Sequence, residues 1–321
     1  MNKEQNTPSK KPGRHTILGA GGAIGNCLTH ELLSHGHEVR LASRSGYAME
    51  ATESVKANID SYNDTLRAVE GSDIVYLCVG LPYDAKVWKD LWPKIMRNTI
   101  DACKKANARL IFFDNVYMYG KTDEKMTETT PYNPCSKKGE IRAAIARQLE
   151  EEMEQGNIRA IIARSADFYG PYAAQTSLPY VMALEKLMKG KKAQWMVDAG
   201  LLHSYSYTID CARGLNLLAG SDDAFNQIWH LPTCNPGING ETFIRLAADE
   251  LGQEASYTVL KKWMIKLGGL FNKTIEELYE MLYQNEMNYH FDSTKFNHYF
   301  RYEPTSYEDG IRETIHFFSK R

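Results

Sequence analysis

The chain has 321 residues, of which 43% are hydrophobic and 24% charged, and its net charge is −2. This composition is typical of a soluble globular protein with one large core, or one core and a lobe. The balanced charge gives no field to attract nucleic acid or anionic lipid, and no apolar run approaches the roughly 18 residues of a membrane span. These features predict no nucleic-acid partner and no membrane partner.

Residues 1–13 are polar and lack the apolar core of a signal peptide, which predicts a disordered tail. The six cysteines are scattered without CxxC pairs or metal-ligand spacing. We therefore expect free thiols in a reducing cytoplasm and no metal site.

Predicted strands and helices then alternate along the chain. The strands are 15–18, 37–43, 54–60, 73–80, 108–116 and 157–165, and the helices are 23–36, 65–71, 93–105 and 136–155. This alternation predicts a Rossmann-type α/β fold, in which helices cover both faces of a doubly wound parallel sheet of at least six strands.

The regular alternation of predicted strands and helices ends beyond residue 170. A helix is predicted in 181–190, a strand running into a helix in 203–220, and one more strand in 225–232. The rest is aromatic-rich and is predicted to be helical. We expect residues 14–172 with 203–233 to form the nucleotide-binding domain, and residues 173–202 with 234–321 to form a smaller, mainly helical substrate lobe over the carboxyl ends of the strands.

The motif LGAGGAIG places Gly19, Gly22 and Gly25 at three-residue spacing between the first strand and the first helix. Glycine permits a tight turn and close approach of the backbone to a pyrophosphate, and the helix start at Ala23 and Ile24 adds oriented N–H groups. The motif predicts a dinucleotide site, whereas the simpler alternative is a plain turn.

The end of the second strand bears on the choice of dinucleotide. An acidic residue there would bind the ribose 2′-hydroxyl of NAD, but the sequence is Leu-Ala-Ser43-Arg44-Ser. A hydroxyl and a guanidinium suit a 2′-phosphate, which favours NADP over NAD. The alternative is an exposed arginine in a loop.

Several short motifs in the sequence resemble those of a known protein family. GAGGAIG, the fourth strand DIVYLCVG, FFDNVYMYG, ARSADFYGP and the late DSTKF (292–296) together resemble the extended short-chain dehydrogenase/reductase superfamily, in its NAD(P)-dependent epimerase/dehydratase branch. The resemblance covers about residues 14–321. It implies cofactor contacts beside the adenine, along the cofactor and near the nicotinamide, at Ile59, Asp60, Cys78, Val79, Gly80, Ser165 and Phe168.

The catalytic signature of that family is a Ser or Thr after the fifth strand and a Tyr-x-x-x-Lys on the next helix. The sequence has Asn115 at the first position, and Asn133 and Pro134 lie four residues before Lys137 and Lys138. Tyr132 precedes a proline and is expected to lie outside the helix. The usual tyrosine is therefore absent.

Two basic residues, Lys138 and Arg142, are neighbours on the helix that begins near Ser136, and Gly139 lies in its first turn. Like charges at this spacing are unfavourable unless an anion or an acid faces them. Both features fit a helix start pressed against a ribose-phosphate, and the pattern resembles atypical reductases such as the isoflavone reductase group, which keep the lysine without the tyrosine. A solvated helix face is the alternative.

Tyr117 is the candidate replacement phenol. Residues 115 and 117 share one face of a strand, so Tyr117 is expected to point into the cleft beside Asn115; the alternative is that it only packs. Lys138 is expected to lower the pKa of that phenol.

His203 stands where nucleotide-sugar enzymes of the family carry an arginine that grips a diphosphate, so its presence argues against such a substrate. His203 is a candidate substrate contact or a surface histidine, and Tyr169 is a second candidate substrate contact.

The sequence as a whole supports an NAD(P)-dependent oxidoreductase or epimerase acting on a small carbonyl, alcohol or sugar-like substrate. Its catalytic groups would be Lys138, Tyr117 and Asn115. The alternative is an inactive NADP(H)-binding sensor that lost hydride chemistry with the tyrosine. A homodimer is left open.

Overall fold

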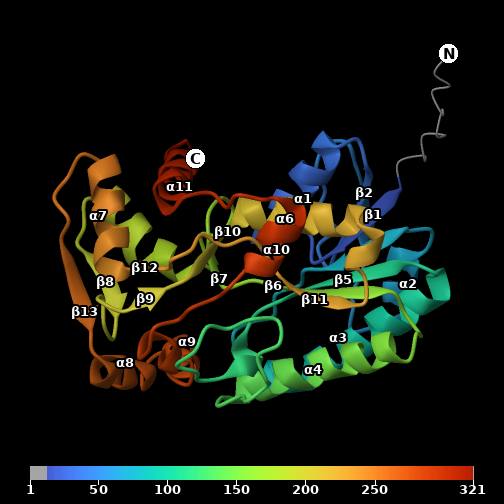
Figure 1. Ribbon diagram of the computed structural model, residues 1–321, viewed down its shortest axis with the longest axis horizontal. Helices are drawn as coiled ribbons and strands as arrows, with labels where there is room; N and C mark the ends of the chain where they lie inside the picture. The colour runs from blue at the N-terminus through green and yellow to red at the C-terminus, as the bar shows by residue number, and fades with distance from the viewer. Residues whose placement is uncertain (1–12, 321) are drawn as a thin grey trace.

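In a computed structural model of the protein, residues 13–320 are described, and a seven-stranded parallel sheet lies at the centre (Figure 1). The predicted tail, apart from Gly13, lies outside the described residues. The strands in spatial order are β11 (Gln227–His230), β6 (Ala160–Arg164), β5 (Arg109–Asp114), β4 (Ile74–Leu77), β1 (Arg14–Leu18), β2 (Glu38–Ser43) and β3 (Thr52–Lys56). The predicted doubly wound α/β fold is confirmed.

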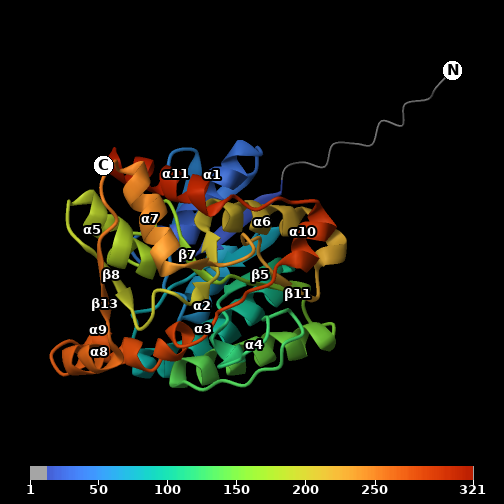
Figure 2. The same ribbon diagram turned by 60° about the vertical axis from the view of Figure 1, so that its left-hand side comes forward.

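Helices cover both faces of this sheet, which is why its central strands are almost wholly apolar and buried. On one face α1 (Ala23–Ser34) packs beside α6 (Thr208–Gly220). On the other face α2 (Tyr62–Val69), α3 (Ala85–Ala106) and α4 (Lys137–Glu154) lie side by side (Figures 1 and 2). Each layer of helices encloses its own hydrophobic core against the sheet.

Helix α3 begins eight residues earlier than the predicted start at Pro93. The side chain of Asp84 caps it, accepting hydrogen bonds from the N–H groups of Lys86 and Val87. The first turns are held by Trp88 and Trp92, which are both buried against the sheet. The prediction was wrong because proline was taken as a helix start, whereas tertiary packing carries the helix through it.

Two strands differ from prediction in ways that affect the site. β3 covers residues 52–56 rather than 54–60, so Ile59 and Asp60 lie in the loop before α2. β5 ends at Asp114, and residues 117–119 form a 3₁₀ turn, η1 (Tyr117–Tyr119). The prediction that residues 115 and 117 share a strand face is therefore wrong.

The remaining residues form a lobe at one end of the sheet, seen at the left of Figure 1. It contains helices, but also three two-stranded sheets that were not predicted from the sequence, so the last third of the chain is not only helical. The paired strands are β7 (Asp167–Tyr169) with β10 (Tyr205–Tyr207), β8 (Ala193–Met196) with β13 (Tyr257–Leu260), and β9 (Leu202–His203) with β12 (Ile238–Asn239).

The helices of this part are mostly short. They are α5 (Glu185–Met188, after a π-helical turn), α7 (Gly240–Glu250), α8 (Lys262–Gly269), α9 (Lys273–Tyr279) and α11 (Tyr307–Ser319). Helix α10 (Thr294–Phe300) lies outside the lobe and packs against β11 of the central sheet. The strands here are too short and their apolar spacing too irregular to show a period of two, which is why no sheet was predicted. Within residues 13–320 no helix is long and apolar enough to cross a membrane.

The strand order fixes where a ligand can bind. The chain leaves β1 toward β2 on one side and later returns to add β4 on the other, so the order reverses between β1 and β4. In such sheets ligands bind at the carboxyl ends of the strands beside this reversal. Gly19 and Cys78 follow β1 and β4, Ser43 ends β2, and backbone hydrogen bonds join these strand ends to one another.

Candidate active site

The glycine loop has the close contacts that its residue types predict. Gly19 has a φ of +98°, and a Cβ there would lie 2.6 Å from the Cα of Val79. A Cβ at Gly25 would lie 3.1 Å from the carbonyl oxygen of Gly19. Both positions therefore favour glycine strongly: the first lets the loop cross the end of β4, and the second lets α1 pack against the loop.

The start of α1 is open to an anion. Gly22 is its N-cap residue and supplies no side-chain acceptor, so the N–H groups of the first turn at Ala23 and Ile24 have no partner within the helix. Gly22 is also uncrowded, since a Cβ there would meet only the carbonyl oxygen of Gly19, at 3.4 Å. Oriented N–H groups at an uncrowded helix start fit a pyrophosphate.

The end of β2 carries the candidate selectivity residues. The hydroxyl of Ser43 accepts a hydrogen bond from the N–H of Tyr47 at 2.7 Å, which folds the loop back over the glycines. The ring of Tyr47 lies against Gly21, a contact that was not predicted from the sequence. Arg44 is exposed, and it makes no ion pair with any residue of the described chain. A guanidinium in this state is free to meet a phosphate.

The other family-implied cofactor positions differ in how accessible they are. Asp60 is exposed, whereas Ile59 is buried. Cys78, Val79 and Gly80 follow β4, and burial raises the pKa of the Cys78 thiol. Ser165 is buried and its hydroxyl donates to the carbonyl of Ala166, while Phe168 is partly buried and lies beside Phe113.

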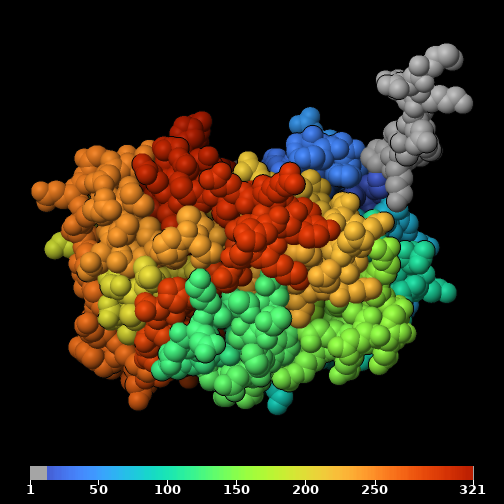
Figure 3. All heavy atoms as spheres, in the orientation of Figure 1, coloured from blue at the N-terminus to red at the C-terminus, as the bar shows by residue number. Residues whose placement is uncertain are grey.

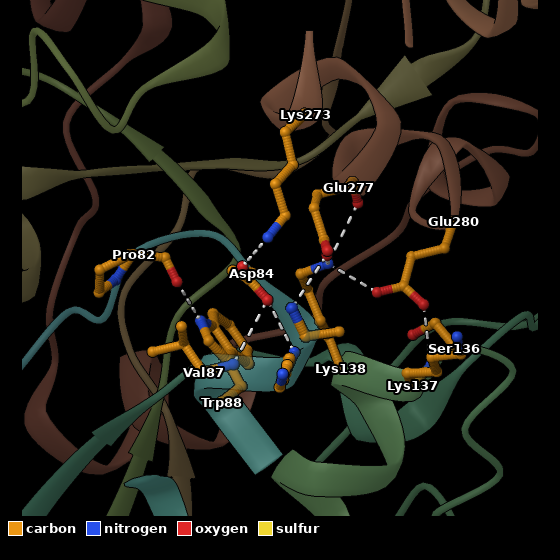
Figure 4. Close-up of polar contacts among 12 residues, drawn as sticks. Pro82, Asp84, Val87, Trp88, Ser136, Lys137, Lys138, Lys273, Glu277 and Glu280 are labelled. Atoms are coloured by element: carbon orange, nitrogen blue, oxygen red, sulfur yellow. Dashed lines mark hydrogen bonds and ion pairs between the residues drawn. The ribbon is translucent and has the colours of Figure 1, made fainter. Parts of the chain in front are cut away.

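Lys138 is fully buried and bound by two carboxylates (Figure 4). Its ammonium contacts Glu277 through a carboxylate oxygen and, at 3.1 Å, the main-chain carbonyl oxygen. It also donates to Glu280 at 2.7 Å, and it lies 4.6 Å from the centre of the Tyr83 ring. Both acids belong to α9 and the residue that ends it.

The same two carboxylates also meet helix starts. Glu277 accepts a hydrogen bond from the N–H of Ala85, the first residue of α3, and Glu280 accepts one from the N–H of Lys137, the first residue of α4. Anions are favoured at these positions because the helix dipole and the free N–H groups point at them. Together with the ion pair from Lys273 to Asp84, these contacts fix α9 across the ends of α3 and α4 (Figure 4).

Arg142, one turn after Lys138, faces a different acid. Its Nε donates to Asp114 at 2.8 Å, and Arg164 lies 3.6 Å from the second oxygen of that carboxylate. All three side chains are buried. The like charges of Lys138 and Arg142 are thus each balanced by acids of this chain. These carboxylates account for the unusual pair without a further anion.

Gly139 has a steric explanation of the same kind. A Cβ there would lie 2.6 Å from the carbonyl oxygen of Tyr117 and 3.1 Å from Pro134. The start of α4 is therefore pressed against the η1 turn, and the glycine in the first turn reflects this contact between two parts of the chain.

Tyr117 and Asn115 do not have the geometry predicted from a strand. The amide oxygen of Asn115 accepts the N–H of Tyr117 at 3.1 Å, which closes a local turn. The Tyr117 ring stacks on Trp88 at 6.3 Å between centres. Burial raises the pKa of Tyr117 well above its ordinary value, and Tyr83 and Asp167 raise it further. The expected lowering of this pKa by Lys138 is not found.

Tyr132 lies outside the helix, as predicted, and away from Lys138. Its hydroxyl donates to Glu150 and accepts from Arg164, so it joins the network beneath the far part of α4. The phenol that lies beside Lys138 is that of Tyr83, whose ring centre is 4.6 Å from the ammonium.

Asp167 and His203 form a pair of which only the histidine was a candidate from the sequence. His203 Nε2 lies 3.1 Å from the Asp167 carboxylate, and its ring is stacked between Tyr205 and Tyr289. His203 is buried, so the surface alternative is wrong. Burial raises the pKa values of Tyr83, Tyr283 and Tyr289, and the partly exposed Asp167 side chain raises them further, which places a carboxylate among several phenols.

Asp167 lines a hollow in the lobe that encloses about 10 Å³ in this structure. The other lining residues are apolar, aromatic or amide side chains: Leu178, Pro179, Met182, Trp195, Met196, Tyr205 and Asn285. Tyr169, the second candidate substrate contact, lies instead in the lobe core against Phe243 and Tyr307, with its side chain buried. Asp167 lies between the family-implied Ser165 and Phe168, so the resemblance already placed it near the nicotinamide, but its pairing with His203 was not predicted.

Two further features bear on the site's chemistry. The six cysteines are all free thiols. Among residues 13–320, no group of three or more His, Cys, Asp or Glu side chains could hold a metal ion.

The parallel sheet with its reversal between β1 and β4, and the glycine loop at that reversal, define a Rossmann-type α/β protein. The sequence profile of the NAD dependent epimerase/dehydratase family matches residues 15–226, so the chain belongs to that family. This confirms the resemblance seen in the sequence motifs. No curated protein sequence matches the chain.

Solved structures of this fold align over nearly the whole chain. A double mutant of the dTDP-glucose 4,6-dehydratase from Streptomyces venezuelae, solved with NAD, has 18% identity and a TM-score of 0.78, covering 96% of this chain and 97% of that one. The UDP-glucose 4-epimerase of Thermus thermophilus, solved with NAD, has 17% identity and a TM-score of 0.76, covering 95% and 99%. The UDP-glucose 4-epimerase of Thermotoga maritima, solved with UDP-glucose, has 18% identity and a TM-score of 0.77, covering 96% and 99%.

Proposed function

We propose that the protein is an NAD(P)-dependent oxidoreductase of the epimerase/dehydratase family that acts on a small, uncharged alcohol or carbonyl compound, sugar-like or not. The proposal rests mainly on the position of Asp167. Its carboxylate lines the hollow, stands three residues after the end of β6, and is paired with a buried histidine. A group that can exchange a proton therefore faces the space where a substrate would lie.

The glycine loop, the open start of α1 and the exposed Arg44 fit a dinucleotide phosphate group. The neighbouring structures from Streptomyces venezuelae and Thermus thermophilus were solved with NAD. The preference for NADP rests on this chain's own residues, because no acid stands at the end of β2 and Ser43 and Arg44 do. NAD would fit the same loop with a weaker hold on the ribose.

Arg44→Ala tests the cofactor preference. A charged hydrogen bond to a phosphate contributes about 1.5–3 kcal/mol, so the variant should bind NADPH about 10- to 100-fold more weakly and NADH almost unchanged. Calorimetric titration of both cofactors measures this. Arg245→Ala, which removes an exposed arginine on α7 distant from the glycine loop, is the control. Equal NADPH and NADH affinities in the unmodified protein would contradict the proposal.

A bound nicotinamide would supply the hydride acceptor or donor. The chain must then take up or release the proton of the substrate oxygen. The raised pKa of Tyr117 keeps its phenol protonated at neutral pH, so it can donate a hydrogen bond to the substrate oxygen, cannot act as a base, and is a weaker acid than an ordinary tyrosine. The Asp167 carboxylate can accept the proton, and His203 holds it in position. In this structure the amide oxygen of Asn115 accepts the N–H of Tyr117, and Lys138 is bound by Glu277 and Glu280.

The lining of the hollow also bears on the substrate. None of its eight lining residues is a lysine or an arginine, and one is an aspartate. A nucleotide diphosphate would meet an acid there without a compensating cation. This lining favours an uncharged substrate over the nucleotide sugars named for the neighbouring structures.

Asp167→Asn and Tyr117→Phe test the proton transfer. We expect each to lower turnover on the order of 10²-fold or more, the usual scale for a group that exchanges a proton, with NADPH affinity little changed. The assay is NADPH oxidation, and NADP⁺ reduction, over a panel of carbonyls and alcohols that includes UDP-glucose. Tyr62→Phe, on the exposed start of α2, is the matched phenol control. Full activity of Asp167→Asn would remove the carboxylate from the mechanism.

The sensor alternative is favoured by one observation. The lysine that the family uses at the cofactor is bound by Glu277 and Glu280, and the sequence has no tyrosine four residues before it. If the protein is a sensor, it should bind NADPH as tightly as expected for the enzyme, but it should not oxidise NADPH with any substrate of the panel.

A further inference from the structure

The helix α8 and the two residues that follow it present an apolar face to solvent. Trp263, Leu267, Leu270 and Phe271 are 68%, 52%, 76% and 87% exposed, and we call these four residues the α8 stripe. Ile265 is the buried residue on the opposite side of the helix. In Figures 1 and 3 the orange segment that contains α8 forms a lower corner of the molecule, away from the central sheet.

The spacing of these residues is that of an apolar helix face, which normally packs against another part of a protein. Positions 263, 267, 270 and 271 are at i, i+4, i+7 and i+8, which lie on one stripe of a helix. In a surface helix this stripe normally packs on the core, whereas here it faces away from it. A contiguous group of large exposed apolar side chains marks an interaction surface.

Lysines flank the α8 stripe at positions 261, 262, 266 and 273. Lys262 pairs with Glu286 and Lys273 with Asp84. Lys261 and Lys266 are exposed and have no ion-pair partner within residues 13–320. One exposed acid, Glu276, has its backbone close to Gly269 at the end of α8. The two unpaired lysines are therefore the groups that an anionic surface would meet.

We propose that the α8 stripe with its flanking lysines docks on the surface of an anionic lipid bilayer, with the helix lying in the interface. Exposed Trp, Leu and Phe beside lysines are the composition of interfacial helices, in which apolar side chains enter the headgroup boundary and lysines meet anionic lipid. A second copy of this chain fits less well, because a twofold contact through the stripe would bring its unpaired lysines toward one another. The proposal is independent of the proposed reaction.

Trp263 allows a direct measurement on the full chain. The other four tryptophans, at positions 88, 92, 195 and 229, are at most 6% exposed, so a change in emission with added lipid reports on α8. We expect a blue shift of this emission with phosphatidylcholine vesicles containing phosphatidylglycerol, and quenching by brominated acyl chains. Vesicles of phosphatidylcholine alone, or high salt, should give much less of both.

Variants separate the apolar and charged contributions. Phe271→Ala with Leu270→Ala, which keeps Trp263 as the reporter, should lower vesicle binding at least about tenfold. Lys261→Glu with Lys266→Glu should abolish the preference for anionic lipid. Leu217→Ala, at an exposed leucine on α6, and Lys189→Glu, at an exposed lysine after α5, are the matched controls and should bind as the unmodified protein does.

Three outcomes would overturn the proposal. The first is the absence of a lipid-dependent shift of Trp263 emission. The second is binding that the α8 variants leave unchanged, which would place the contact elsewhere in the chain. The third is a concentration-dependent dimer, seen by sedimentation without lipid and lost in Phe271→Ala with Leu270→Ala, which would make a second copy the occupant.

Discussion

Lys138→Met is expected to lower the free energy of unfolding by about 2–3 kcal/mol and to loosen α9 from the ends of α3 and α4. The substitution keeps most of the side-chain volume but leaves Glu277 and Glu280 without their shared cation. Breaking a fully buried pair costs about 3–5 kcal/mol. The loss here should be smaller because the two carboxylates are 17% and 24% exposed and can be rehydrated. Urea unfolding measures the loss, and hydrogen exchange of residues 273–280 shows where it falls.

Lys137→Met is the matched control, since this neighbouring lysine is exposed and contacts Glu280 only through its backbone N–H. It should change stability little. If Lys138→Met is no more destabilising than the control, the contacts between Lys138 and α9 do not hold the lobe in place.

The same variant shows whether Lys138 also serves the cofactor. We expect Lys138→Met to weaken NADPH binding, whereas Glu277→Gln with Glu280→Gln should leave that affinity unchanged or raise it, because the ammonium is then free to meet the ribose. Equal NADPH affinities in the two variants and the unmodified protein would show that Lys138 only holds α9. Calorimetric titration makes the comparison.

Asp114→Ala is expected to be the most destabilising single substitution, at about 3–5 kcal/mol. The Asp114 carboxylate accepts from Arg142 at 2.8 Å and lies 3.6 Å from Arg164, and all three side chains are almost completely buried. Its removal leaves Arg142 without a counter-charge between the sheet and α4, and leaves Arg164 with only Glu150, at 3.7 Å. The expected loss is a large part of the roughly 5–15 kcal/mol that holds a typical domain folded.

Asp222→Ala provides the comparison. Asp222 also contacts two arginines, Arg109 and Arg159, but its side chain is 70% exposed. Surface pairs of this kind contribute about 0–1 kcal/mol. Urea unfolding of both variants should separate them clearly. A similar small loss in each would mean that water reaches the Asp114 network in the folded protein.

These two clusters explain why α4 could be located from the sequence while its chemistry could not. The Ser136 cap, the apolar stripe and Lys138 are local features, and the helix begins where they predict. The partners of Lys138 come from residues about 140 positions later in the chain. The spacing of the basic residues predicted that an anion or acid had to face the lysine, and only the folded chain supplied Glu277 and Glu280.

A small error in the predicted end of β5 led to a wrong prediction for the direction of the Tyr117 side chain. The predicted β5 was two residues too long, and the alternation of a strand then aimed Tyr117 into the cleft. In the structure Asn115 accepts the Tyr117 N–H and turns the backbone into η1, so the ring stacks on Trp88. Asx turns of this kind depend on one side-chain hydrogen bond and are hard to distinguish from a strand end by composition.

The sequence by itself determined the parallel sheet, the position of the glycine loop at its carboxyl edge, and the absence of a tyrosine four residues before either lysine. These depend on hydrophobic periodicity and on residue types within short windows. Only the tertiary structure decided that Lys138 is bound by α9, that Asp167 and His203 meet beside a hollow, and that the α8 stripe faces outward. The first two depend on side chains from distant segments that meet in the folded chain. The third depends on which side of a helix the core leaves uncovered. The spacing of residues within a short window predicts neither kind of feature.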